Sequence, residues 1–190
     1  MRQFDIKSHE QLRAMAEPIR TEIVEIVSFL GPCSIRQLAR YMGRKRPALH
    51  FHVARLMEVG LLLEAGDRGE GRQREMLYRT VGAPIYMLYD REDPLNVDMT
   101  IRYSKNILSR AQRQLASSFS SGRAVTDGPE RDTHATQMTA WLTKSELARL
   151  NKTIAKLDDL LKPSDKIEGR ELYSLTLGLA PVNPHGSVET

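Results

Sequence analysis

Apolar residues recur every three or four positions along the first sixty residues, a spacing typical of amphipathic helices. Ser8 with Gln11, and again Ser34 with Gln37, have the spacing at which a helix caps its own first turn. The pattern predicts four helices, over residues 8–17, 18–30, 34–43 and 47–60. Two of them, 34–43 and 47–60, are joined by a short basic turn that begins at a glycine, as in a helix-turn-helix unit.

The pattern then changes to short extended runs. Residues 61–65 and 75–81 favour strands, and the glycine-rich loop 66–74 between them predicts a hairpin. The tip of this hairpin carries three arginines and no apolar side chain, so we expect it to lie in solvent. Helices followed by such a hairpin stand in the order of a winged helix-turn-helix, which we predict for residues 1–83.

The second half is organised differently. We interpret residues 84–98 as a connector, and a stripe of apolar residues from Ile101 to Phe119 predicts a helix of about twenty residues. Alternating patterns over 136–142 and 171–180 predict two strands around a helix over 144–161, which Thr143 and Glu146 would cap. The predicted fold class is α+β: a winged helix-turn-helix, then a long helix and a small β-α-β module within residues 99–182, and a loose tail from 183 to 190.

The distribution of charged residues along the chain is more informative than the net charge. The chain has 28 Lys and Arg against 24 Asp and Glu, a net charge of only +4. Residues 36–79 alone hold ten basic and five acidic residues, so the positive charge is concentrated there. A basic stretch within such a unit favours contact with phosphates. One cysteine and the lack of a long apolar run favour a cytoplasmic protein, with no membrane contact.

Residues 12–66 resemble the ArsR-like winged-helix regulators of bacteria and archaea. The resemblance rests on LRAMAEPIR at 12–20, SIRQLA at 34–39 and RPALHFHVARLMEVGL at 46–61. It implies a sequence-specific, DNA-binding transcriptional regulator whose 47–60 helix enters the major groove of double-stranded DNA. The arginines of the 66–74 loop would then contact the DNA backbone or the minor groove. The founding members of that family sense metals through paired cysteines on the helix that corresponds to 34–43. Here that helix has none, so we expect no metal site. The sequence has no nucleophile motif, no carboxylate pair at catalytic spacing and no phosphate-cradling glycine loop before a helix, so we expect no other cofactor and no enzymatic activity.

The 47–60 helix has two faces at 100° per residue. Leu49, Val53 and Leu56 share the face expected to pack inward. The first turn is what enters the groove in helix-turn-helix proteins, with Arg46 suited to a guanine and Ala48 or Phe51 to a thymine methyl. Phe51 packed against the hairpin or a second subunit is the alternative, and His52 is interpreted as a structural residue hydrogen-bonded within the domain. The predicted DNA contacts are Ser34, Arg36, Arg44, Lys45, Arg46, Ala48, His50, Phe51, Arg55, Arg68, Arg72 and Arg74.

One recognition helix reads only a few base pairs, which favours a homodimer on two half-sites. The 101–119 helix and the C-terminal module would then supply the dimer contact. Whether that region also binds a small effector or a protein partner stays open. The alternative function is a winged-helix adaptor that binds proteins and no specific DNA, because fold alone does not determine function.

Overall fold

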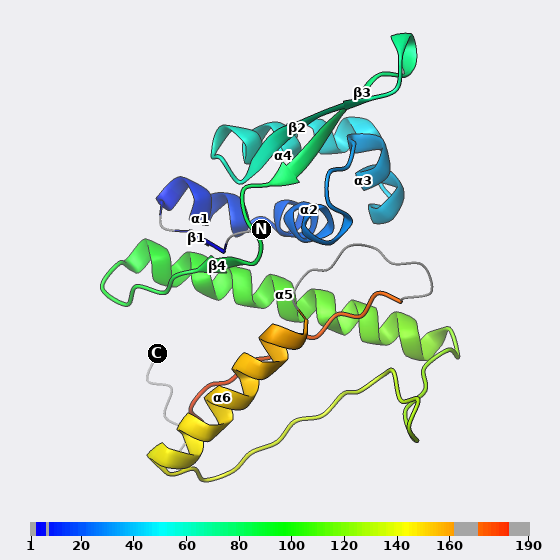
Figure 1. Ribbon diagram of the computed structural model, residues 1–190. Coiled ribbons are helices and arrows are strands. Elements are labelled where there is room, and N and C mark those ends of the chain that lie inside the picture. Colours follow the sequence, from blue (N-terminus) through cyan, green and yellow to red (C-terminus); the bar gives the residue numbers. More distant parts are fainter. Residues whose placement is uncertain (1–2, 7, 162–170, 183–190) are drawn as a thin grey trace.

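The computed structural model describes residues 3–6, 8–161 and 171–182, and the chain is α+β (Figure 1). Its helices are α1 His9–Met15, α2 Pro18–Leu30, α3 Ile35–Met42, α4 Arg46–Glu58, α5 Pro94–Ser120 and α6 Lys144–Leu160. Its strands are β1 Phe4–Ile6, β2 Leu62–Arg68, β3 Glu75–Thr80 and β4 Ile85–Met87, with a short 3-10 turn at Gly71–Gln73. None of the helices in the described ranges is both long and apolar enough to cross a membrane.

The helices of the first half begin where their side chains cap them. Ser8 accepts a hydrogen bond from the backbone N–H of Gln11 at the start of α1. Ser34 and Gln37 form a reciprocal capping box at the start of α3. Gly43 ends α3 in the left-handed conformation, with a φ of 60° that costs a glycine little. The predicted starts of these helices are confirmed.

The core lies where the inner faces of α1, α2, α3 and α4 meet β2. Leu12, Ile23 and Leu38 are fully buried there. From α4, Leu49, Val53 and Leu56 enter the same core, as the helical spacing predicts. Burying one such side chain stabilises the fold by about 1.5–3 kcal/mol, so these contacts hold α4 firmly against the bundle.

The strands β2 and β3 form an antiparallel hairpin, from the pair Leu62 and Thr80 to the pair Arg68 and Glu75. Its register shifts between Glu64 and Asp67, and its tip projects away from the helices (Figure 1). Cys33, in the turn between α2 and α3, bridges to β3 through backbone hydrogen bonds with Tyr78 of 3.0 and 2.9 Å. The hairpin is therefore fastened to the turn that precedes α3.

The predicted connector 84–98 is wrong in part. Residues 85–87 form β4, which pairs in parallel with β1 at the start of the chain. The helix α5 begins at Pro94, because Asp93 caps it through the backbone N–H of Leu95. Asp93 also contacts His9 at 2.6 Å, and Asn106 donates to the carbonyl of Ala16, so α5 is tied to α1 and the turn after it.

The two strands predicted in the C-terminal half are not formed. Residues 136–142 and 171–180 have no regular secondary structure, so no β-α-β module exists within the described residues. The helix between them is confirmed as α6, but none of its side chains is buried. In Figure 1, α5 lies beneath the α1–α4 bundle and α6 crosses below α5. The alternation of apolar and polar residues was not enough to form a strand, because neither segment lies beside another described strand with which it could form backbone hydrogen bonds.

Candidate nucleic-acid interface

The turn between α3 and α4 leads into an open helix start. Arg44 donates its backbone N–H to the carbonyl of Ala39 at 2.9 Å, which closes α3. Lys45 is the N-cap of α4 and its side chain makes no capping hydrogen bond, while Pro47 occupies the first turn. The first N–H groups of α4 therefore have no side-chain acceptor, and such groups favour an anion.

The exposed face of α4 is the one that the helical spacing predicts. Phe51, on this face, is 70% exposed. The candidates from the turn and the first half of α4 are all exposed: Arg44, Lys45, Arg46, Ala48, His50 and Phe51. Within the described part of the chain, the side chains of Arg44, Lys45 and Arg46 form no ion pair or hydrogen bond. We call these six exposed residues, from the turn and the first half of α4, the α4 surface.

The start of α3 is already occupied by an acidic side chain. Ser34 is buried, and its hydroxyl donates to Glu75 of β3 at 2.8 Å. The guanidinium of Arg36 pairs with the other carboxylate oxygen of Glu75 at 2.9 Å. In this arrangement the hydroxyl of Ser34 is not available to a phosphate, and Arg36 is neutralised by a neighbour from the hairpin.

The hairpin arginines also have partners. Arg68 donates to the side-chain oxygen of Gln37 at 3.0 Å, and Arg74 donates from Nε to Asp67 at 2.7 Å. Both arginines remain exposed. The side chain of Arg72 lies outside the described part of the structure. Before the described arginines bind a phosphate, they must exchange these contacts, which are weak in water.

Arg55 lies in the last turn of α4, away from its open start. It is half-buried and pairs with Glu58 at 2.6 Å. The hydrogen bond from this guanidinium to Glu58 raises the pKa of Arg55. The pair faces the helix end and is separated along α4 from the other candidates. Arg55 is thus the one predicted α4 residue that the structure does not place with the rest.

The expected hydrogen bond of His52 is absent. Its Nδ1 is buried and finds no partner among the described residues. The ring packs edge-on against Phe51, with centroids 5.6 Å apart. Burial lowers the pKa of His52, and the charges of Arg20 and Arg44 lower it further. We conclude that His52 supports the α4 surface in its neutral form.

Sequence reasoning missed the acidic and amide residues that organise these arginines. Glu75, Gln37 and Asp67 bind Arg36, Arg68 and Arg74 respectively. Glu75 is 41 residues from Ser34 in the chain, so no local sequence pattern predicts their contact. Only the capping role of Gln37 has a signal in the sequence, which is its spacing from Ser34. Over the same described residues, no three His, Cys, Asp or Glu side chains gather as metal ligands would.

A family model covers this part of the chain, and a solved structure aligns with most of the chain. The model of the HVO_A0114 family matches residues 15–81, which run from the end of α1 to the end of β3. No curated protein matches the chain. Among solved structures, the chain is similar to the "Crystal structure of RV1404 from Mycobacterium tuberculosis", with 13% identity over 80% of this chain and 81% of that chain. The TM-score of 0.30 is too low to define a shared fold.

Proposed function

We propose that this chain is a sequence-specific DNA-binding transcriptional regulator of the winged helix-turn-helix type, as its resemblance to ArsR-like regulators implies. The observation that carries the proposal is the open start of α4. Three cations without partners, Arg44, Lys45 and Arg46, precede a helix turn whose backbone N–H groups lack a side-chain cap. A positive, uncapped and exposed helix start is suited to the phosphates and base edges of a major groove.

The hairpin supplies a second contact in this proposal. Its exposed Arg68 ends β2 and its exposed Arg74 directly precedes β3, in the hairpin that projects from the bundle as a wing does when it follows a DNA backbone. Their weak contacts with Gln37 and Asp67 would be replaced by contacts with phosphates. We expect these contacts to raise affinity for all sequences alike, since phosphate contacts carry no sequence information directly.

The proposal includes a homodimer formed through α5 and the C-terminal half. Large apolar side chains are left in water there, among them Trp141 at 88% and Met138 at 86% exposure. A standard dimer covers only about 800 Å² on each partner, so the available surface is sufficient. Sedimentation that shows a monomer, both alone and on its best DNA site, would exclude the dimer.

Selection from a random DNA library tests the main proposal. We expect the wild type to enrich one sequence, Arg46→Ala to relax the preference at one or two positions, and Arg44→Ala to weaken all sequences equally. Arg91→Ala, an exposed arginine in the turn before α5 and outside both the candidate interface and the proposed dimer contact, is the matched control and should change neither. No enrichment, together with no binding to mixed DNA at about 50 mM salt, would contradict the proposal.

One observation favours a second candidate function. Phe51 is 70% exposed at the centre of the α4 surface, and exposed aromatic residues are common in protein interfaces. The adaptor hypothesis therefore predicts that Phe51→Ala abolishes binding to a protein partner, in a chain that has no affinity for mixed DNA. In the DNA-binding hypothesis the same substitution lowers sequence preference and leaves a measurable nonspecific affinity.

A further inference from the structure

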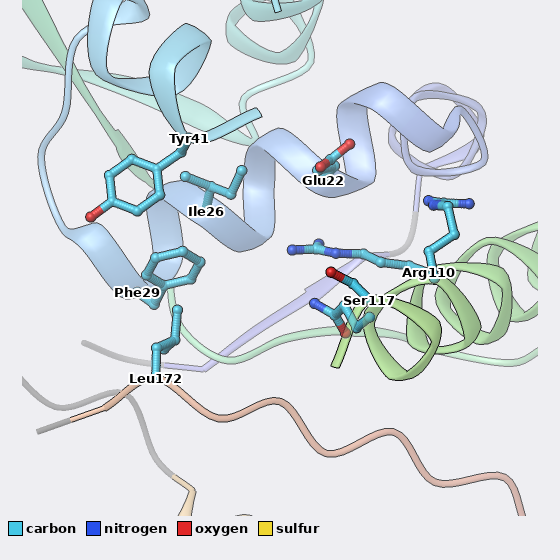
Figure 2. A pocket seen from close by; sticks show the side chains of 9 residues that line it. Glu22, Ile26, Phe29, Tyr41, Arg110, Ser117 and Leu172 are labelled. Carbon is cyan, nitrogen blue, oxygen red and sulfur yellow. The ribbon is translucent and has the colours of Figure 1, made fainter. Parts of the chain in front are cut away.

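Residues 171–182 have the pattern of a strand but no strand beside them. From Tyr173 to Leu179, every second side chain is large and apolar, and each of these is about half exposed. Figure 2 shows Leu172 beside Phe29 of α2, and from there the chain runs on without a helix or turn past α5 and α6 (Figure 1). Residues 171–182 form no hydrogen bond between backbone groups within the described ranges. Their N–H and C=O groups are therefore open to a neighbouring strand.

Nothing in this segment prevents another strand from pairing with it. Folded proteins usually protect an exposed strand edge with a lysine, another charged residue or a proline. Residues 172–180 contain none of these, and Glu171 and Pro181 flank them only at the two ends. Nine residues are also an ordinary length for a strand. The segment is therefore a template for a second strand, and its lack of charge means that two copies of it meet without repulsion.

The order of side chains in the segment is symmetric about Thr176. In an antiparallel pair that sets Thr176 opposite Thr176 of a second copy, each large side chain between 173 and 179 lies opposite a large one, and each small side chain opposite a small one. The pairs are Leu175 with Leu177, Tyr173 with Leu179, and Ser174 with Gly178. A two-fold axis at Thr176 produces this register, because such an interface uses the same surface on both subunits. The pattern therefore fits a second copy of this chain.

Helix α6 provides an apolar cover for such a pair. Ile154 and Leu157 of α6 line one hollow together with Leu175 and Leu177. No side chain of α6 is buried in the single chain, although an amphipathic helix usually packs its apolar face against another element. A two-stranded ribbon alone is only marginally stable, and packing against a helix stabilises it. In the dimer, both α6 helices can pack on the shared sheet.

The exposed apolar area is of the size that a dimer needs. The large apolar side chains of the segment are between 49% and 67% exposed: Leu172, Tyr173, Leu175, Leu177 and Leu179. A half-exposed side chain of this size leaves roughly 100 Å² in water, so these contribute roughly 500 Å². A standard interface buries about 800 Å² on each partner. Leu160 and Leu161, 79% and 47% exposed at the end of α6, lie in the element that covers the segment and extend this area.

We propose that residues 172–180 of two copies pair as antiparallel strands across a two-fold axis at Thr176, and that the two α6 helices cover the resulting sheet. This contact rests on the homodimer of the proposed function and specifies how that dimer forms. In Figure 1, α4 and α6 lie on opposite sides of α5, so the pairing leaves the α4 surface of each subunit free.

Cysteine cross-linking without DNA tests the register. Opposed residues of an antiparallel pair have Cα atoms about 4.5–5.5 Å apart, which a disulfide can span. We therefore expect Thr176→Cys to form a disulfide-linked dimer on mild oxidation. Ser174→Cys is the matched control, because its own copy lies four residues, or about 13 Å, along the pair. It should cross-link only when it is co-expressed with Gly178→Cys, and the wild type, whose Cys33 is buried, should not cross-link.

Sedimentation equilibrium tests the same contact by charge. Thr176→Lys and Thr176→Glu each place like charges directly opposite one another, so each should weaken the dimer about fivefold, the upper end for a cross-strand pair. An equimolar mixture of the two variants should recover the wild-type affinity, which a variant that fails to fold would not do. The same two substitutions at Thr139, an exposed residue of the other alternating segment, are the matched control and should leave the dimer unchanged.

Three results would each overturn the proposal: a wild type that is monomeric at about 100 μM, a Thr176→Cys chain that cross-links no better than Ser174→Cys, or a mixture of the Lys and Glu variants that is no tighter than either alone. In the last two cases a persisting dimer would keep the dimer of the proposed function and reject only the strand pairing. A chain that pairs in this register but enriches no DNA sequence would refute the proposed function and keep the contact.

Discussion

Glu75 offers the sharpest test of how the candidate nucleic-acid interface contacts DNA. Its carboxylate binds both Ser34 and Arg36, and only 17% of its side chain is exposed. In Glu75→Gln the amide oxygen still accepts the hydrogen bond from Ser34, but the negative charge that neutralises Arg36 is lost. Arg36 is 61% exposed, so the released guanidinium is free to contact a phosphate.

The expected magnitude follows from counterion release. One additional phosphate contact changes the slope of log K against log salt by about −0.9. Between about 50 and 200 mM salt, the variant should therefore lose about 3.5-fold more affinity than the wild type, and it should bind mixed DNA more tightly at the lower concentration. The lost ion pair should cost no more than about 1 kcal/mol of unfolding free energy, because its arginine is exposed.

Fluorescence anisotropy on a duplex of mixed sequence measures both quantities. The control is the double variant Glu75→Gln with Arg36→Gln, in which the slope should return to the wild-type value. A slope unchanged in Glu75→Gln would mean that Arg36 does not reach the DNA. A steeper slope that persists in the double variant would mean that the added contact comes from another residue, and the reasoning about Arg36 would be refuted.

Three further predictions concern the fold around this surface. Burial, followed by the charges of Arg20 and Arg44, lowers the pKa of His52, so the folded state resists protonation. The contribution of His52 to the unfolding free energy should therefore be fully present above pH 6.5, the pKa of histidine in the unfolded chain, and should be lost as the pH falls below it. Urea titrations over this pH range should show a smaller loss of stability in His52→Gln. Burial raises the pKa of the Cys33 thiol to about 11, so alkylation at about pH 8 should require unfolding, and rapid labelling of the native chain would contradict this burial. A Cβ at Gly69 would lie 2.6 Å from the carbonyl oxygen of Gln73, whereas at Gly66 it would meet nothing within 4 Å. Gly69→Ala should thus shift the amide resonances of the hairpin tip more than Gly66→Ala, although both positions have a positive φ.

The first half of the fold could be predicted because its signals are local. Ser34 and Gln37 cap the same turn of α3, and Leu49, Val53 and Leu56 share one face of α4. Such patterns need no knowledge of distant residues. The start of α5 carried a local signal too, since Asp93 followed by Pro94 is an N-cap before a first-turn proline, but the connector interpretation overlooked it.

The elements that failed depend on partners far away in the chain. Phe4 pairs with Ile85 across some eighty residues, and strands of three residues leave too short a pattern to recognise. Conversely, residues 171–180 alternate as a strand would but lie in no sheet. Alternation describes which side chains share a face, and it does not provide the neighbouring backbone that a strand requires.

The same limitation applies to charge, and it leads to a last prediction. Residues 36–79 hold ten basic side chains, but Glu75, Asp67 and Glu58 pair with Arg36, Arg74 and Arg55 respectively. What remains most concentrated is the group Arg44, Lys45 and Arg46 at the start of α4. If these three, together with Arg68 and Arg74 of the hairpin, carry the phosphate contacts, the salt slope should be about −4.5 for each subunit, whereas ten contacts would give about −9. The wild-type slope on mixed DNA distinguishes the two values directly. A result near −9 would show that DNA also displaces Glu75 and Glu58 from Arg36 and Arg55, and that the open start of α4 is not the principal contact.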